Sequence, residues 1–264
     1  YGFLDYQNVA KLRLGRYEFN TWYGNSALFT KPFTKTVTET NPCFFKIRDK
    51  EPWIGTLFVC PFCFKYTDIQ MEWEHHMNCC KFKSSLPGKV MYNDGQLIVR
   101  KVKGVDHKLF CQCMCLMAKF FLDNKSVFYD LDYFDFYIAY QLLDRHEVPM
   151  GFYSRELLSW ESNNLSCICV LPCYQNRRLG TKLIDFSYKL SHYEQQISGP
   201  ERPFSPLGKL TYLRYWCRNL ALSFVYGSLS TKKHVTLQLI SETTGFRTED
   251  ILFAFSFLNV LSDN

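Results

Sequence analysis

The chain has 264 residues, a mass of 31.2 kDa and a formal net charge of +6, with 47% apolar and 21% charged residues. This mixture excludes intrinsic disorder, which requires few apolar and many charged residues. No stretch of about 18 uncharged apolar residues predicts a transmembrane helix, and residues 1–16 mix charges with aromatics, so we expect no signal peptide. The mild positive charge is compatible with a nucleic-acid or chromatin partner without requiring one.

The 12 cysteines fall into groups that need separate explanations. In a chain without a secretory signal, thiols are metal ligands, buried apolar side chains or nucleophiles rather than disulfides. Cys111 and Cys115 share a helix face with no His or fourth thiol beside them, and we assign them to the core.

The densest cysteine group predicts a zinc site. It has the pattern Cys60-x2-Cys63-x12-His76-x3-Cys80. The C-x2-C pair on a turn offers two thiolates to one ion, and a His and a Cys four residues apart share one face of a helix. Together they complete a tetrahedral Cys3His site for Zn²⁺. The small core of this finger is expected from Phe62, Phe64 and Met71.

Two alternatives accompany this prediction. His75 and Cys79 form a neighbouring register on a helix face rotated by about 100°, but the twelve intervening residues before His76 are the usual finger loop. The other alternative is a loop of free thiols. Because one finger reads only about 3 base pairs, a structural staple or a platform for a protein partner is at least as good an interpretation as DNA binding.

The elements expected in the first half of the chain are mostly strands. Residues 9–25 alternate apolar and polar side chains, as a half-buried strand does, and the finger follows to about residue 82. Residues 89–104 predict a hairpin because two alternating runs flank Asn93-Asp94-Gly95, a sequence that tolerates positive φ. The remaining elements expected here are a buried helix over 110–125 and strands over 126–144 and 150–160.

Lys119 lies inside the apolar run 110–125. One interpretation is a lysine whose stem packs while its ammonium group reaches solvent, helped by Asp123 four residues later. The other is a buried functional lysine. The residues alone leave both open.

A strand, a short loop and a helix follow in residues 166–194. The apolar run 166–175 contains a proline near its end and predicts an interior strand. Arg177, Arg178 and Gly180 then stand at a helix N-terminus, where free backbone N–H groups and guanidinium groups favour phosphate. The apolar stripe of the helix is Leu179, Leu183, Phe186 and Leu190.

The loop 198–209 contains three prolines and one carboxylate of interest. Ser205 and Pro206 have the pattern of an N-cap and a first helical residue, which predicts a helix from about Pro206 to Val225. Glu201 sits between two prolines in a rigid exposed loop. It is either a solvated carboxylate or, in apolar surroundings, a general base.

Residues 234–259 have the pattern of a helix–turn–helix. The first helix is expected to end at Gly245, and Thr248 to cap the second, with Glu249 and Asp250 in its first turn. A DNA-reading helix would carry Lys and Arg, which the second helix lacks. We therefore interpret this segment as a packing or protein-contact module.

In this order, the segments resemble the MYST family of histone acetyltransferases, and most closely its small fungal member that serves as the catalytic subunit of the SAS silencing complex. The resemblance covers residues from about 9 to 216. It is carried by LGRYEFNTWYGN, CPFCFKYTDIQMEWEHHMNCC, FCQCMCLMAKFFLDNKSVFYD, SCICVLPCYQNRRLGTKLIDFSYKLSHYE and GPERPFSPLGKLTYLRYW.

The resemblance implies an α+β (mixed) fold: a GNAT-like acetyltransferase core with a bent, mixed sheet, an N-terminal Cys2HisCys zinc-finger region and a C-terminal helix–turn–helix-like segment. We expect three parts. They are residues 1–85 with N-terminal strands and a finger at about 53–82, an acetyl-CoA-binding core over 86–226, and the helix–turn–helix-like segment over 227–264.

The resemblance also implies that acetyl-CoA binds where two strands splay apart, and that the zinc ion is structural. Backbone groups of Ile168, Cys169 and Val170 are expected to contact the acetyl and pantetheine groups. The remaining contacts expected are the pyrophosphate loop of Gln175, Asn176, Arg177, Arg178, Leu179, Gly180 and Thr181, and Ser205.

Three residues match family residues with a chemical role. Glu201 matches the catalytic glutamate, proposed to deprotonate the substrate lysine, which is a strong nucleophile only as the neutral amine. Cys167 matches an active-site cysteine described either as a transient acetyl acceptor or as a spectator, and we favour direct transfer with Glu201 as the base. Lys119 matches the lysine that family members autoacetylate.

The phosphate loop departs from the family pattern Q-x-x-G-x-G. Arg178 replaces a glycine, and Asn176 stands where a basic residue is common. A side chain at position 178 hinders close approach of the backbone to phosphates. We therefore expect weakened cofactor binding, or activity that depends on partner subunits.

Two functions compete. The first is a histone lysine N-acetyltransferase in chromatin silencing, with histone H4 favoured. The second is a zinc-finger chromatin adaptor with a degenerate acetyltransferase core, while sequence-specific DNA binding is disfavoured. The resemblance implies a nuclear location, a histone tail or nucleosome as substrate, and partner subunits; no membrane partner is expected. A cationic tail calls for local acidic groups, for which the candidates are Asp130, Asp132 and Asp135.

Overall fold

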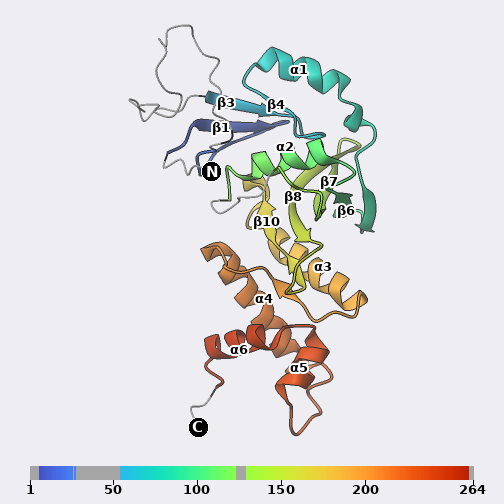
Figure 1. The fold of residues 1–264 in the computed structure, drawn as a ribbon, viewed down its shortest axis with the longest axis vertical. Helices are drawn as coiled ribbons and strands as arrows, with labels where there is room; N and C mark the ends of the chain where they lie inside the picture. Colours follow the sequence, from blue (N-terminus) through green and yellow to red (C-terminus); the bar gives the residue numbers. More distant parts are fainter. Residues whose placement is uncertain (1–5, 26, 28–53, 123–128, 262–264) are drawn as a thin grey trace.

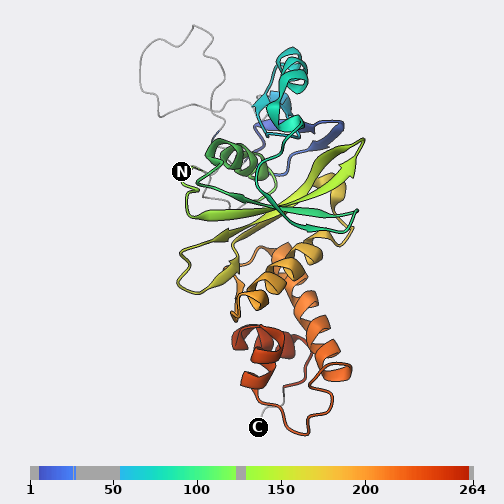
Figure 2. The ribbon, with the colours of Figure 1, turned by 90° about the vertical axis from the view of Figure 1, so that its right-hand side faces the viewer.

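The computed structural model describes residues 6–25, 27, 54–122 and 129–261 of the chain. The molecule is elongated, with an N-terminal sheet and the finger at one end, a larger sheet in the middle and a group of helices at the other end (Figures 1 and 2). No helix in these described ranges is long and apolar enough to cross a membrane.

The N-terminal sheet has four strands in the order β2-β1-β3-β4. The single strand expected over 9–25 is a hairpin instead, because the chain turns at Gly15, whose φ is 57°. The helix α1 (Gln70–Cys79) follows this sheet. The strands are β1 (Val9–Leu14), β2 (Tyr17–Asn20), β3 (Ile54–Val59) and β4 (Tyr66–Thr67).

The central sheet has five strands in the order β10-β8-β7-β6-β5, and every neighbouring pair is antiparallel. In Figure 2 the helices α2 (Lys108–Ala118) and α3 (Leu179–Tyr193) lie on opposite sides of this sheet. The hairpin predicted over 89–104 is confirmed as the first two of its strands. The strands are β5 (Lys89–Asn93), β6 (Ile98–Lys103), β7 (Phe134–Leu143), β8 (His146–Glu156) and β10 (Cys167–Val170).

The run 166–175 forms an edge strand rather than the expected interior strand, since β10 pairs only with β8 within this sheet. It is apolar because helix α3 covers it. An edge strand leaves one row of backbone N–H and C=O groups unpaired by the sheet.

A separate two-stranded parallel sheet joins β9 (Asn163–Leu165) to β11 (Gly199–Pro200). The expected α+β (mixed) fold is confirmed, but its strands are divided between an antiparallel central sheet and this separate parallel pair. Among the described strands, parallel pairing is confined to β9 with β11 and β1 with β3. The cause is a bend at Ser166, whose N–H donates to the Ser154 carbonyl at 2.7 Å, so that two consecutive strands enter different sheets.

The C-terminal helices are α4 (Pro206–Val225), α5 (Leu237–Thr244) and α6 (Thr248–Phe257). Ser205 caps α4 as predicted and accepts from the Gly208 N–H at 3.1 Å. Gly245 ends α5 in the left-handed region, with φ 72°. Thr248 is the first residue of α6 and not its cap, because the N-cap position belongs to Arg247.

The core is continuous from the central sheet into the C-terminal helices. Cys111 and Cys115 are fully buried in α2, which confirms their assignment to the core. Trp216 of α4 is equally buried, and its indole Nε1–H donates to the Tyr188 hydroxyl of α3 at 2.8 Å. This contact ties the C-terminal helices to the helix that covers β10.

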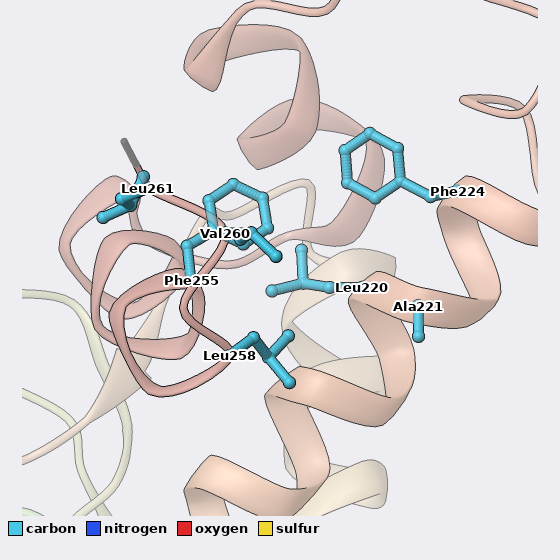
Figure 3. Close-up of a pocket in the computed structure, with 7 residues that line it drawn as sticks. All are labelled: Leu220, Ala221, Phe224, Phe255, Leu258, Val260 and Leu261. Atoms are coloured by element: carbon cyan, nitrogen blue, oxygen red, sulfur yellow. The ribbon is translucent and has the colours of Figure 1, made fainter. Parts of the chain in front are cut away.

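An apolar groove of about 400 Å³ lies between the C-terminal half of α4 and the end of the chain that follows α6 (Figure 3). All of its lining side chains are hydrocarbon, so it can bind apolar groups but holds no acid, base or nucleophile. The lining residues are Leu220, Ala221, Phe224, Phe255, Leu258, Val260 and Leu261.

Candidate functional site

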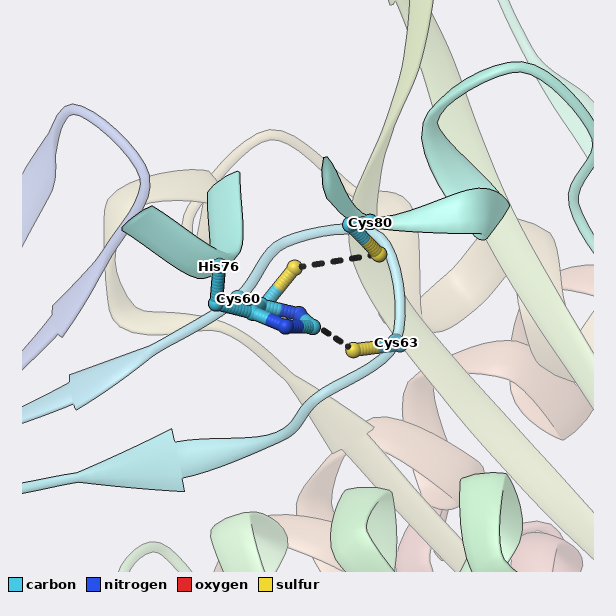
Figure 4. A group of neighbouring side chains, drawn as sticks. All are labelled: Cys60, Cys63, His76 and Cys80. Atoms are coloured by element: carbon cyan, nitrogen blue, oxygen red, sulfur yellow. Dashed lines mark hydrogen bonds between the residues drawn. The ribbon is translucent and has the colours of Figure 1, made fainter. Parts of the chain in front are cut away.

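The structure brings together the four residues predicted to bind zinc. The ligand atoms of Cys60, Cys63, His76 and Cys80 all lie within 4.8 Å of one another (Figure 4). The His76 Nε2 atom is 3.1 Å from the Cys63 Sγ atom, and the Sγ atoms of Cys60 and Cys80 are 3.8 Å apart. Three thiols and one imidazole at this spacing are a donor set that fits a tetrahedral Zn²⁺ ion.

Hydrogen bonds already favour a thiolate within this group. A hydrogen bond from Cys60 is the largest cause that lowers the pKa of the Cys63 thiol, while the same hydrogen bond and then burial raise the pKa of Cys60. The alternative register is ruled out, since Cys79 is exposed with its thiol directed to the His76 carbonyl, and His75 is also exposed.

Two details of the predicted finger are wrong. Cys80 is not on the helix but one residue beyond it, in an extended conformation (φ −65°, ψ 115°) that turns its thiol back toward Cys60. Met71 is 79% exposed and contributes nothing to the core of the finger. Trp73 is buried instead, and its indole Nε1–H donates to the Val59 carbonyl at 3.1 Å, because this side of α1 packs on β3.

Two of the three residues matched to chemical roles, Glu201 and Cys167, lie on neighbouring segments. Glu201 directly follows β11, and its backbone N–H donates to the Leu165 carbonyl of β9 at 2.8 Å. Cys167 begins β10 two residues after Leu165, is half-buried, and donates its N–H to the Ser154 hydroxyl at 3.2 Å. The Glu201 side chain is exposed to solvent, as expected for this loop.

Two residues of β10 direct their backbone N–H and C=O groups toward the open edge of the sheet. Leu171 donates its N–H to the Met150 carbonyl at 3.0 Å. Because an antiparallel ladder alternates, Ile168 and Val170 then point their backbone groups away from β8. The Gln175 amide confirms this for one of them, since it donates to the Val170 carbonyl at 3.0 Å.

The predicted phosphate loop leads from this edge into α3. Lys182 donates its N–H to the Arg178 carbonyl at 3.0 Å, so the first intrahelical bond starts there. The N–H groups of Leu179, Gly180 and Thr181 have no intrahelical acceptor, as at any helix start. A Cβ atom built on Gly180 would have only the Val170 side chain near it, at 3.8 Å, so the start of α3 is open on that side.

Arg178 has φ 59° and Asn176 has φ 61°, both in the left-handed region. Only glycine adopts this region without a steric cost. The position at which the family pattern has glycine is therefore one at which the backbone favours glycine.

Lys119 is the C-cap of α2 and is half-buried, and this burial lowers the pKa of its ammonium group. Asp123, expected beside it, lies outside the described residues.

One of the three aspartates predicted to face the cationic tail is wrong. Asp135 is buried and ion-paired with Lys101 at 2.6 Å, so it cannot meet an incoming tail. Asp130 is exposed, while Asp132 pairs with Lys108 at 2.9 Å. Asp135 is buried because both faces of β7 are covered, as the continuous burial of residues 135–140 shows, and its charge alone did not indicate this.

Sequence reasoning assigned no functional part to two residues that contact the Glu201 segment. Arg247 and Asp250, at the start of α6, hold Pro200 and Arg202 respectively. The sequence feature that could have indicated them is an Arg and an Asp within an apolar C-terminal segment. Their partners are distant in the sequence, so no local pattern identified them.

The fold combines a group of three thiols and one imidazole that could bind zinc with a core of sheets and helices. Residues 85–264 match the MOZ/SAS family. The chain therefore belongs to this family, the MYST class of acetyltransferases, whose chemistry uses acetyl-CoA.

Curated relatives agree over nearly the whole chain. Histone acetyltransferase SAS2 of Saccharomyces cerevisiae is 42% identical over 100% of this chain and 78% of its own length. Histone acetyltransferase of the MYST family 2 of Arabidopsis thaliana is 35% identical over 98% of this chain, and Histone acetyltransferase MOF of Drosophila melanogaster 33% identical over 96%. The chain spans 53% and 28% of these two longer relatives.

Proposed function

We propose that this chain transfers the acetyl group of acetyl-CoA to a lysine of a histone tail, with histone H4 favoured, in chromatin silencing in the nucleus. Similarity over the full chain to the relative named SAS2 supports the substrate class. The observation that carries the proposal is the hydrogen bond from Glu201 N–H to Leu165 O, because it keeps the proposed base beside the segment that leads into Cys167.

The residues present fit an acyl-CoA. The outward backbone groups of Ile168 and Val170, with Cys169 between them, would hold the acyl and pantetheine groups. The free N–H groups at the start of α3, the backbone of the loop 175–181 and the Arg177 guanidinium would hold the pyrophosphate. Ser205, whose hydroxyl also caps α4, would contact the cofactor. When bound, acetyl-CoA supplies an acyl group activated as a thioester.

The chain's own part in the reaction is proton transfer and orientation. In our proposal the Glu201 carboxylate accepts a proton from the lysine ammonium, which leaves the amine lone pair free to attack the acyl carbon. The N–C bond would form as the C–S bond breaks, and the departing coenzyme A thiolate would take up the second proton that the nitrogen loses. The exposed position of Glu201 suits an incoming tail. Cys167 borders the reacting atoms without carrying the acetyl group.

Several further roles complete the proposal. Cys60, Cys63, His76 and Cys80 hold a structural Zn²⁺ ion, and Lys119 is the site of autoacetylation. The chain divides into residues 1–85, 86–226 and 227–264, and acts with partner subunits on nucleosomes. Asp130, exposed beside the partly buried Asp132, is the remaining acidic candidate for the cationic tail.

The main test is mass spectrometry of nucleosomes after incubation with acetyl-CoA and the protein purified with its partner subunits. Wild type is compared with Glu201→Gln, and an acetylated H4 lysine is expected only with wild type. Acetylation by wild type confined to another histone would contradict the H4 preference, and equal acetylation by both proteins would contradict the base.

One observation favours the alternative, a chromatin adaptor with a degenerate core: the Arg178 side chain in a left-handed position of the phosphate loop. A thermal shift with acetyl-CoA separates the two functions. A ligand that binds only the native state must stabilise it, so no shift at saturating acetyl-CoA would favour the adaptor.

A further inference from the structure

We propose that Asp250 and Arg247, at the start of α6, are positioning residues that hold the Gly199–Arg202 segment and thereby place the Glu201 carboxylate. The proposal rests on the proposed role of Glu201 as general base. It assigns the C-terminal helices a part in the reaction, as a rigid support behind the loop that carries the base.

The first contact is made by Arg202, the residue that follows the proposed base. Arg202 donates from Nη2 to the Asp250 Oδ1 atom at 2.5 Å. Asp250 is fully buried, whereas the Arg202 side chain is 41% exposed. The buried carboxylate is thus the fixed end of the pair, and the arginine is drawn onto it from the loop. Glu201 directly precedes Arg202 and is exposed, so holding Arg202 on the buried Asp250 restricts the backbone positions from which the Glu201 side chain can reach solvent.

The second contact is made by Arg247, which binds both strands of the small parallel sheet. The Arg247 guanidinium donates to the Pro200 carbonyl at 3.5 Å, directly before Glu201. The same group donates to the Asn163 Oδ1 atom of β9 at 2.8 Å and to the Glu161 carbonyl. One side chain of α6 therefore joins β9 to the residue that precedes the base.

The backbone is fitted to this arrangement at two points. Ser198 donates its N–H to the Gly245 carbonyl at 3.2 Å, which pairs the start of the loop with the turn before α6. A Cβ atom built on Gly199 would lie 2.5 Å from the Asp250 Oδ2 atom and 3.2 Å from the Arg247 side chain. A glycine is therefore required for the loop to approach α6 this closely.

These contacts are stronger evidence for positioning than for mere packing. The Asp250 Oδ2 atom has no hydrogen-bond partner in the described part of the chain. Burying an ionisable group costs stability. Such a group, bound to the residue that follows the proposed base, is expected where the geometry of the loop matters more than the stability of the fold.

The test uses the full chain purified from its host with the subunits that accompany it, assayed with acetyl-CoA and core histones. Asp250→Asn is expected to lower kcat at pH 7 by about tenfold or more, with the KM for acetyl-CoA changed less than twofold. Glu242→Gln, which removes an exposed carboxylate from the neighbouring helix α5, is the matched control and is expected to retain full activity.

Between pH 7 and 9, well above the pH at which Asp250 titrates, a purely structural role would lower the folded fraction by the same amount throughout. The pH profile over this range therefore separates the two explanations. With a misplaced base, the substrate amine must lose its proton unaided, and the rate deficit of Asp250→Asn should shrink as the pH rises from 7 to 9. Full binding stoichiometry for acetyl-CoA verifies folding. Gly199→Ala is expected to produce the same change in the profile, and Arg202→Lys to retain more activity than Arg202→Gln.

Glu201→Gln in the same assay distinguishes failure of this inference from failure of the proposed function. Inactive Glu201→Gln beside fully active Asp250→Asn would overturn the positioning role alone. Fully active Glu201→Gln would remove the base, and the positioning role with it. A deficit of Asp250→Asn that stays constant from pH 7 to 9 would also overturn the inference.

Discussion

The Glu201 backbone N–H and the Leu165 carbonyl, 2.8 Å apart, join two segments that are distant in the sequence. The bond continues the parallel pairing of β11 with β9 by one residue. Because β10 starts two residues after Leu165, the register of a two-residue strand decides how close the carboxylate of Glu201 lies to the open edge of the central sheet. The proposed acetyltransferase site thus depends on the two-stranded sheet of β9 and β11.

Glu201→Gln should reduce kcat for histone acetylation about 10²- to 10⁴-fold at pH 7, the usual contribution of a positioned general base. The amide is isosteric, and the backbone bond to Leu165 is unchanged, so acetyl-CoA affinity should stay within a factor of two. Steady-state rates and calorimetry measure the two quantities. A loss of affinity equal to the loss of rate would mean that Glu201 binds rather than deprotonates.

Cys167→Ala tests direct transfer. Since the proposed chemistry passes no acetyl group through the thiol, this variant should keep more than a tenth of the wild-type kcat and form product without a burst phase. Cys169→Ala, one pleat away and buried, is the matched variant for packing effects. A 10³-fold loss confined to Cys167→Ala would show that the thiol carries the acetyl group.

Arg178→Gly should improve the phosphate loop. The side chain at position 178 hinders close approach of phosphate to the backbone. Relief of roughly 1 kcal/mol of this hindrance should tighten acetyl-CoA binding about fivefold, measured by calorimetry. Arg178→Ala is the control, because it removes the guanidinium group but keeps the Cβ atom. If both variants bind more weakly than wild type, the guanidinium contacts phosphate and the prediction is wrong.

Local signals were sufficient for much of the fold. The spacing around Cys60 and His76 predicted the four side chains that the structure brings together, and Ser205-Pro206 gave the correct start of α4, because both depend on local sequence. Pairings between distant segments had no such signal. The edge position of β10, the burial of Asp135 and the contact of Asp250 with Arg202 all depend on which strands and helices meet, which alternation and composition do not specify.

The metal site can be tested by paired cysteine variants. Cys80→Ala should lose one equivalent of zinc per chain and lower the melting temperature by at least about 5 °C, because a structural metal site contributes directly to folding. Cys79→Ala should keep both properties, since that thiol is exposed and outside the group. Elemental analysis and thermal denaturation measure the outcome, and zinc loss in Cys79→Ala instead would restore the alternative register.

Asp250 should make the free energy of unfolding decrease as the pH rises. A carboxylate paired at the surface does the opposite, because its pKa is lowered on folding. Burial raises its pKa from 3.8 to about 6, against the hydrogen bond and charge of Arg202 and the charge of Arg247, which lower it. The other ionisable groups that face it are Glu249 on its own helix, Tyr188 on α3 and Tyr212 on α4.

Because the native state binds this proton more tightly than the unfolded chain does, the contribution of Asp250 to stability is complete below about pH 4 and is lost as the pH rises through 6. The whole change is roughly 3 kcal/mol. Asp250→Asn removes this titration, so the free energy of unfolding of wild type minus that of the variant should fall between pH 4 and pH 7.5, as measured by urea denaturation at both values. Glu242→Gln controls for the loss of one negative charge. If the difference rises with pH instead, Asp250 is stabilised as a carboxylate by its arginine partners more than it is penalised by burial.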